Sequence, residues 1–279
     1  MVVYASNENG NSVSEEKIIE LKKAKSENSE ELLIKPNMYM VSVGVSKFID
    51  ANNNLDFADD DAREMTKLFK GQQCLLYNDV QVKELTDEQA NRLNILDAFS
   101  WLERSVTNKD IAIIFIATLG FNQKEKFYIL PYDGEYDKYR ATCVDWSDFG
   151  EILKNLPCRT VLFLDACHSG QLGKNLYATR GTAESNTEAI RELATEESGI
   201  VILSASTDAE KSLESKAWGH GAFTYSILNA VNTKEGDLNK NNIIYLNELE
   251  YYIAENVKKL TEGQQYPTTQ KPSTIIVST

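Results

Sequence analysis

Apolar and amphipathic segments alternate along most of the chain, and this alternation predicts an α/β fold. Near-continuous apolar runs, typical of strands covered on both faces, lie at residues 38–45, 110–120, 126–133, 159–166 and 199–207, with a shorter strand at 81–85. Amphipathic segments predict helices at 57–71, 86–106, 144–156, 221–232 and 246–261. We therefore expect a mostly parallel central sheet with helices on both faces. A last apolar run, at 273–279, would close the sheet.

Residue types at the ends of these segments support the expected boundaries. The helix at 57–71 has its acids in the first turn, where the helix dipole favours them, and a glycine at its end. Thr86 is the expected N-cap of the next helix. The apolar strand at 110–120 should end at Gly120.

Two segments do not follow the alternation. Residues 1–36 contain an Asn-Glu-Asn-Gly turn signal and then a charged stretch. They are interpreted as an appendage, either a hairpin or the last strands of an upstream β domain, with a linker. The main domain is expected at 37–279. Within it, residues 171–198 are long, polar and without a convincing strand, and loops of this kind are usually functional or disordered.

Composition narrows the class of protein. The chain has 279 residues, of which 42% are hydrophobic, and a net charge of −13. No apolar run is long enough to span a bilayer and no secretory signal is visible, so we expect a cytoplasmic protein. An acidic surface argues against nucleic acid or anionic membrane as a partner and suits a basic partner. The four cysteines are irregularly spaced, which argues against a structural zinc site and for reduced thiols.

The stretch "CRTVLFLDACHSGQLG", residues 158–173, is the strongest chemical signal. An apolar strand ends in Asp165, and Cys167, His168 and a glycine follow at once. Ligands in such sheets bind at the carboxyl ends of strands, so Cys167 is well placed to be exposed. An ordinary buried cysteine is the alternative, but an uncompensated acid seldom ends an apolar strand without a role.

The segment "DACHSG" resembles the nucleophile motif of the caspase-like cysteine peptidases, particularly the metacaspases and their bacterial relatives. Further blocks resemble that family in the same order: "MYMVSVGVSKF", "FADDDA", "FYILPYD", "VILSAST" and "WGHGAFTYSILNAV". The resemblance covers about residues 35–279. It implies the caspase-like α/β sandwich and proteolysis by a Cys-His dyad, with Cys167 as nucleophile and backbone N–H groups of Cys167 and Gly120 holding the oxyanion.

The chain departs from the family at the base. The family's Ser-Gly-His-Gly type motif corresponds here to Ala117, Thr118, Leu119 and Gly120, so leucine replaces the histidine. Leucine cannot accept a proton, and a general base contributes about 10²–10⁴-fold. Activity should therefore be severely reduced. A natural loss and a deliberate His→Leu substitution both stay open, and the otherwise intact pocket favours recent or deliberate loss.

The chain has two histidines, and neither is expected to replace the base. His168 follows the nucleophile on extended backbone, so that its side chain should point to the opposite face. His220 precedes a helix, at a position where the family often has a histidine without a catalytic part.

Acidic residues predict which substrates would fit. In the metacaspase branch, the positions that match Asp165 and Asp61 face the substrate side chain, and two carboxylates would select arginine or lysine. Asp208 is expected at the pocket rim. The resemblance also makes residues 171–198 a candidate self-processing loop, with Arg180 as the first cleavage candidate and Lys174 as the second. An uncut solvated loop is the alternative.

Residues 237–248 match part of the EF-hand template, with Asp237, Asn239 and Asn241 at positions 1, 3 and 5 and Glu248 at position 12. Asn242 replaces the usual glycine. A polar turn before the helix near Leu246 explains the pattern better, and calcium stays the alternative. No cofactor is required by the expected chemistry.

Two functions are consistent with these observations. The first is an endopeptidase domain that cuts protein or peptide substrates after Arg or Lys, inactive or trapped here because of Leu119. The second is a pseudo-peptidase module that binds basic segments through the same pocket. Either would suit an effector domain of a larger regulated protein with an upstream sensor.

Overall fold

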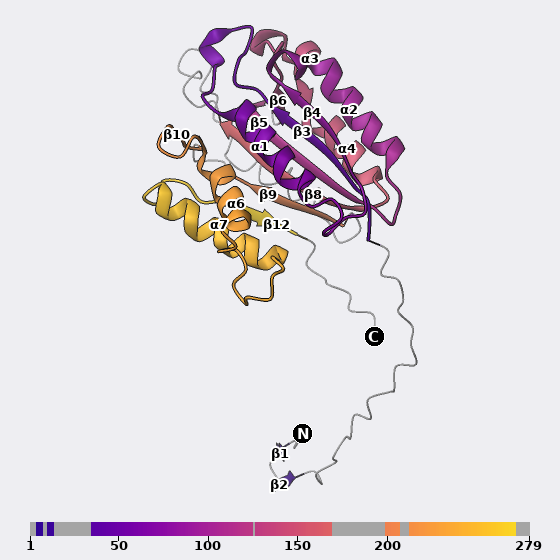
Figure 1. Cartoon of the computed structure of the whole chain (residues 1–279), viewed down its shortest axis with the longest axis vertical. Coiled ribbons are helices and arrows are strands. Elements are labelled where there is room, and N and C mark those ends of the chain that lie inside the picture. Colours follow the sequence, from indigo (N-terminus) through magenta and orange to yellow (C-terminus); the bar gives the residue numbers. More distant parts are fainter. Residues whose placement is uncertain are drawn as a thin grey trace. The chain divides into compact units, whose positions relative to one another are not determined.

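The computed structural model describes residues 4–7, 10–13, 35–124, 126–168, 199–206 and 212–271, with the backbone alone in the first two ranges and at residues 167 and 168. The chain divides into two compact units, Met1–Ile34 and Lys35–Thr279 (Figure 1). In the first unit, β1 (Tyr4–Asn7) and β2 (Gly10–Val13) pair antiparallel, with Asn7 opposite Gly10. This antiparallel pairing agrees with the turn signal, and it fits both interpretations of the segment, a hairpin and the last strands of an upstream β domain.

The second unit is built around one mixed sheet, with strand order β12-β9-β8-β5-β3-β4. All neighbours in this row are parallel except β12, which runs antiparallel to β9. The strands are β3 (Met38–Gly44), β4 (Val80–Thr86), β5 (Ile111–Gln123), β8 (Arg159–His168), β9 (Ile200–Ser204) and β12 (Thr268–Gln270). The predicted, mostly parallel sheet is therefore confirmed.

Helices cover both faces of the sheet, as predicted (Figure 1). One face packs against α2 (Arg92–Ser105) and α4 (Trp146–Asn155), with Phe99 and Phe149 in the core. The other packs against α1 (Ala58–Lys70), α6 (Ala222–Asn232) and α7 (Leu246–Leu260). Short elements complete the fold: α3 (Tyr139–Thr142), β7 (Val144–Asp145), β10 (Glu214–Ser215), β11 (His220–Gly221), and the 3₁₀ turns Ala51–Asn53, Asp87–Gln89 and Tyr136–Lys138.

The prediction that the second apolar strand ends at Gly120 is wrong. β5 continues to Gln123, because β6 (Lys126–Leu130) folds back on it as an antiparallel partner. Gly120 lies opposite Ile129 of β6 and opposite His168 of β8. Its role is close packing, since a Cβ here would lie 2.4 Å from Cζ of Phe127.

Two other boundaries differ from the sequence prediction. Thr86 is the last residue of β4, where it pairs with Gly44, and it does not cap the long helix. α2 begins at Arg92, with the side chain of Asn91 accepting from the Asn94 N–H at 3.0 Å. The sheet is closed in the described part of the chain by β12, whereas the predicted strand at 273–279 lies outside the described residues.

Candidate functional site

The carboxyl-terminal half of β5 and the carboxyl end of β8 bring the candidate catalytic positions together. Leu119 is the register partner of Cys167, and Gly120 is the register partner of His168. Adjacent strands lie about 4.8 Å apart, so residue 119 is next to the candidate nucleophile. Leu119 is buried, with 6% of its surface exposed, and belongs to the core cluster under α2 and α4. The position therefore holds an apolar side chain with no proton acceptor.

The strand ladder surrounds Gly120 on both sides, with β6 along one edge of β5 and β8 along the other. The site is thus the middle of a paired strand rather than a free strand end. The prediction that Gly120 offers its N–H to an oxyanion stays a prediction.

Two buried carboxyl groups converge beside the end of β8. Asp165 lies on β8 and Asp61 in the first turns of α1, and they are only 5% and 1% exposed. A Cβ added to Gly221 would lie 3.1 Å from Oδ2 of each, so Gly221 is where both carboxyl groups meet. Oδ1 of Asp165 is buried and has no hydrogen-bond partner among the described residues.

The electrostatics of Asp165 follow from this burial. Desolvation, together with the nearby charge of Asp61, raises the pKa of Asp165 to about 7, and a hydrogen bond from Ser212 opposes the shift. Two carboxylates in one buried site cannot both ionise freely. A cation beside the pair would therefore stabilise the ionised forms of both carboxyl groups.

Asp61 is held by partners that sequence reasoning missed. Its Oδ1 lies 2.7 Å from Nδ1 of His220, and its Oδ2 accepts from the Gly221 N–H at 3.1 Å. Burial raises the pKa of Asp61, and these two contacts oppose the shift. The hydrogen bond to Asp61 raises the pKa of His220. His220 thus binds one of the two buried acids, a contact that its place before a helix in the "WGHGAF" block did not predict.

Two further residues tie the nearby segments together, and neither was predicted. Oε2 of Glu214 accepts from the Asp56 N–H at 3.0 Å, just before α1, and burial raises the pKa of Glu214. The fully buried Gln265 accepts from the Leu213 N–H and donates to the Ala205 carbonyl, both at 2.8 Å. Gln265 thus joins Leu213 to Ala205, just after β9, and Glu214 joins its own segment to the start of α1.

Several predicted site residues lie outside the described residues: Asp208, Lys174, Arg180 and the whole candidate processing loop, 171–198. The other three cysteines differ from Cys167 in position. Cys74 is exposed, whereas Cys143 and Cys158 are buried. Burial raises the pKa of both buried thiols, that of Cys143 to about 11, which makes them poor nucleophiles.

The loop at 237–248 directs its carboxylates to its own backbone. Asp237 accepts from the N–H groups of Asn241 and Asn242 at 3.0 and 2.7 Å. Glu248 accepts from those of Asn239 and Tyr245 at 3.1 and 2.9 Å, as the N3 residue of a capping box on α7. Asn242 has a φ of 66°, which the template assigns to glycine. These contacts are those of a polar turn before a helix.

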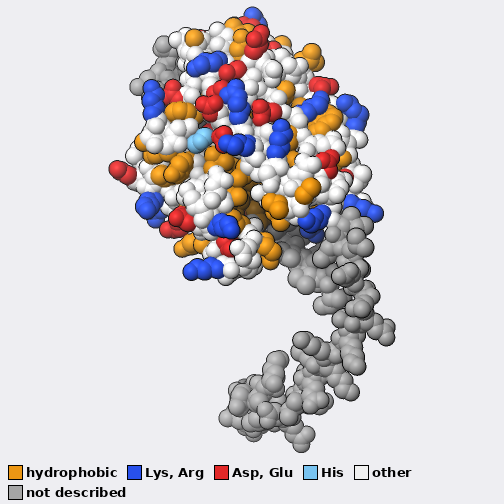
Figure 2. Space-filling view, viewed as in Figure 1, with side chains coloured by type: hydrophobic (Ala, Val, Ile, Leu, Met, Phe, Trp, Pro, Cys, Tyr) orange, Lys and Arg blue, Asp and Glu red, His pale blue; other side chains and the backbone are white. Residues whose placement is uncertain are grey.

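No helix among the described residues is both long and apolar enough to cross a membrane. Figure 2 shows acidic and basic side chains interspersed over the visible face. The negative net charge therefore forms no single-sign patch on that face.

Comparison with known proteins agrees with this fold. The family model of the caspase domain matches residues 39–275. Among solved structures, protein GSU0716 from Geobacter sulfurreducens is 15% identical with a TM-score of 0.62, covering 86% of this chain and 96% of that one. The Drosophila initiator caspase Dronc is 10% identical with a TM-score of 0.56, covering 85% and 80%. At such identities the likeness shows the fold alone. No curated protein sequence matched.

The chain therefore belongs to the caspase domain family, as the resemblance of its motifs predicted. Its domain is that of a caspase-like peptidase, and the family's chemistry is in general that of cysteine peptidases.

Proposed function

We propose that this domain is a caspase-like endopeptidase with a pocket for arginine or lysine, and that Leu119 leaves its nucleophile, Cys167, without a base. The observation that carries the proposal is the pair of buried carboxyl groups, Asp61 and Asp165, at the end of the strand that holds Cys167. The motif resemblance indicates that the acid pair lines the substrate pocket. Two buried carboxyl groups favour a substrate side chain with a positive charge.

The pocket favours a cation because one acceptor in it has no donor among the described residues. Asp61 already uses both oxygens, whereas Oδ1 of Asp165 is buried and no described residue donates to it. A guanidinium or ammonium group would supply that donor and would favour the ionised form of Asp165. A charge-assisted hydrogen bond of this kind contributes about 1.5–3 kcal/mol.

The same geometry explains a block in catalysis. A thiol needs a base or a field that forms the thiolate, and the position beside Cys167 holds a buried leucine. Without the base, the segment 171–198 should stay uncut at Arg180 and Lys174. With the base restored, Arg180 is the first cleavage candidate.

A second function fits the same site: a module that binds basic segments without cutting them. The packing of Leu119 into the core cluster favours it. The rate of alkylation of Cys167 near neutral pH, mapped by mass spectrometry, discriminates the two. Rapid labelling indicates a site still assembled for catalysis, and slow labelling favours the binding module.

The pocket itself can be tested on the chain as it stands, by calorimetry with acetyl-Ala-Ala-Arg-amide and its citrulline analogue, which keeps the shape and loses the charge. The arginine peptide should bind at least about tenfold more tightly, the equivalent of about 1.4 kcal/mol. Asp165→Asn should abolish the difference. The matched control Asp148→Asn, on the exposed side of α4, should keep it. Equal affinities for both peptides would remove the basic pocket from the account.

A further inference from the structure

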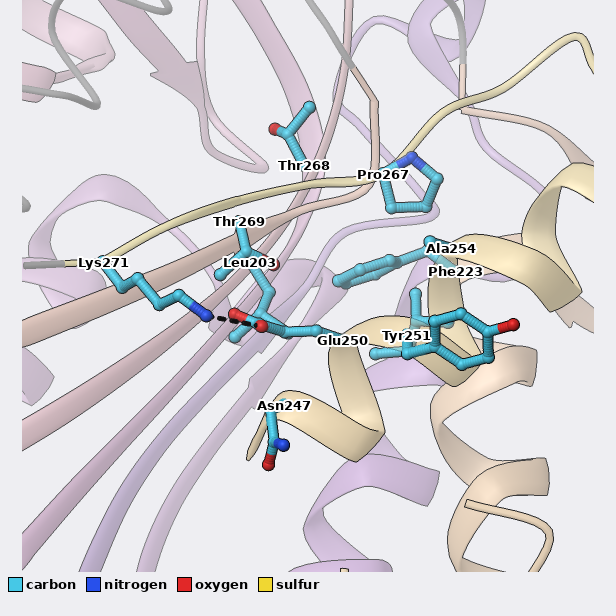
Figure 3. A pocket seen from close by; sticks show the side chains of 11 residues that line it. Leu203, Phe223, Asn247, Glu250, Tyr251, Ala254, Pro267, Thr268, Thr269 and Lys271 are labelled. Atoms are coloured by element: carbon cyan, nitrogen blue, oxygen red, sulfur yellow. Dashed lines mark hydrogen bonds and ion pairs between the residues drawn. The ribbon is translucent and has the colours of Figure 1, made fainter. Parts of the chain in front are cut away.

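A cavity outside the site described above lies between α7 and the edge strand β12 (Figure 3). Its volume is about 360 Å³, large enough for a long side chain. Leu203 of β9, Phe223 of α6 and Ile253 of α7 form an apolar floor, and Pro267 lies beside it. Leu203, Phe223 and Ile253 are almost fully buried. Core side chains thus form one wall of the cavity.

Glu250 gives this cavity a carboxylate with an unused acceptor. Its Oε2 accepts from Nζ of Lys271 at 2.8 Å, the contact drawn in Figure 3. Its Oε1 is buried and has no hydrogen-bond partner among the described residues. The Glu250 side chain is 15% exposed, whereas that of Lys271 is 51% exposed and can turn into solvent. An acceptor buried without a donor costs about 1–3 kcal/mol, so a donor that replaces the Lys271 side chain beside this carboxylate and reaches Oε1 would be stabilised.

An open sheet edge lies beside the cavity. β12 pairs with β9 through Thr268, Thr269 and Gln270, and it is the last strand of the sheet in the part of the chain that the structure describes. An unpaired edge offers backbone donors and acceptors to an extended peptide, and a neighbouring pocket can take one of its side chains. Thr268, Thr269 and Lys271 also line the cavity, so one segment could use both features.

We propose that β12 and this cavity bind an extended segment of a partner protein that places a lysine or arginine side chain in the cavity. The aliphatic stem lies on the apolar floor and the cationic head donates to Oε1 of Glu250. The net charge of −13 favours such a basic partner. The surface is separate from Cys167, so the inference does not depend on the proposed peptidase activity.

Residues that line the cavity are also close in sequence and in strand register to residues of the acid pocket. Phe223 of its floor is two residues beyond Gly221, against which Asp61 and Asp165 converge. Ser204, the neighbour of Leu203, pairs with Leu164, which precedes Asp165. A partner held here would therefore be anchored near the candidate active site.

Fluorescence anisotropy with a labelled Thr-Val-Lys-Val-Thr peptide tests the proposal on the full chain, with norleucine in place of lysine as the matched peptide. The lysine peptide should bind below about 1 mM, and the norleucine peptide about fivefold more weakly, as expected for one net hydrogen bond. Glu250→Gln should abolish this difference. Glu255→Gln, which removes the same charge from an exposed position of α7, should preserve it. Ala254→Phe, which fills the cavity, should weaken both peptides.

Four results would overturn the proposal. One is no binding of either peptide, and a second is equal loss with Glu250→Gln and Glu255→Gln, which shows a general charge effect. A third is that the peptides bind only to a variant of the chain that ends at Lys271. That result would make residues 272–279 of the chain itself the segment that occupies this surface. The last is dimerisation in sedimentation that Glu250→Gln disrupts, which makes a second copy the occupant. If Ala254→Phe fails to fold, Glu250→Gln still decides.

Discussion

At the scale of single residues, Asp165 links the sequence motif to the chemistry of the site. It ends an apolar stretch of β8, it is 5% exposed, and it meets Asp61 beside Gly221. Burial of an acid is unfavourable unless a partner supplies charge or hydrogen bonds. No described residue donates to Oδ1 of Asp165, so a donor there would be favoured, and this is what would select a cation in the proposed pocket.

The cost of burying Asp165 predicts how stability depends on pH. Burial raises its pKa to about 7 in the folded chain, from an ordinary value of 3.8. The folded state therefore binds more protons than the unfolded state between these values, and the free energy of unfolding falls as pH rises through this window. Asp165→Asn removes this loss, so the variant should be more stable at pH 8 by on the order of 4 kcal/mol.

Urea unfolding at intervals from pH 4 to pH 8 measures this difference, which should grow with pH. Asp148→Asn serves as the control and should follow the parent chain. If the free energies of unfolding of Asp165→Asn and the parent change in parallel with pH, burial does not raise the pKa of Asp165 in the folded state.

The sequence could not predict which polar side chains from distant segments contact each other in the fold. The motif resemblance indicated Asp61 and Asp165 as partners, and the structure brings them together. The sequence did not reveal that His220 binds Asp61, or that Glu214 accepts from Asp56. These pairs are separated by more than 150 residues, and no local periodicity records which polar side chains meet when α1 packs beside β11.

At the scale of elements, the hydrophobic pattern predicted most strands and helices because it reflects burial on one or both faces. It was wrong at Gly120 because a glycine can end a strand or allow close packing. Here β6 returns along β5, and the ring of Phe127 occupies the space beside the glycine. Which role a glycine has depends on a neighbouring strand that the local sequence does not show.

The close packing at Gly120 predicts a coupled pair of substitutions. Gly120→Ala places a methyl group 2.4 Å from the Phe127 ring, and overpacking of this kind costs about 1–3 kcal/mol. Phe127→Leu shortens the ring side chain and should relieve the clash. Thermal unfolding of both single variants and the double variant should show a destabilisation smaller than the sum, with a coupling of about 1 kcal/mol or more. Additive effects would show that Phe127 is not the obstacle.

At the scale of the whole molecule, the candidate site is assembled from segments that are far apart in sequence. β5 and β8 place residue 119 beside Cys167, α1 contributes Asp61, and β11 contributes Gly221. Leu119 belongs to the core cluster under α2 and α4, whereas the cluster on the other face of the sheet does not include it. A polar side chain at residue 119 should therefore lower stability as well as change catalysis, so the fold of such a variant is checked before its activity.

The most direct test compares the parent chain with Leu119→His on fluorogenic peptides that end in Arg, Lys or Asp, with Cys167→Ala in the same background as control. The histidine variant should cleave after Arg or Lys at least about 100-fold faster than the parent, the usual contribution of a general base, and should become nicked near Arg180 on gels. Cys167→Ala should abolish both effects. If the folded histidine variant is inert on all three peptides, or prefers Asp, the proposed base, nucleophile and pocket do not form a peptidase site of this kind.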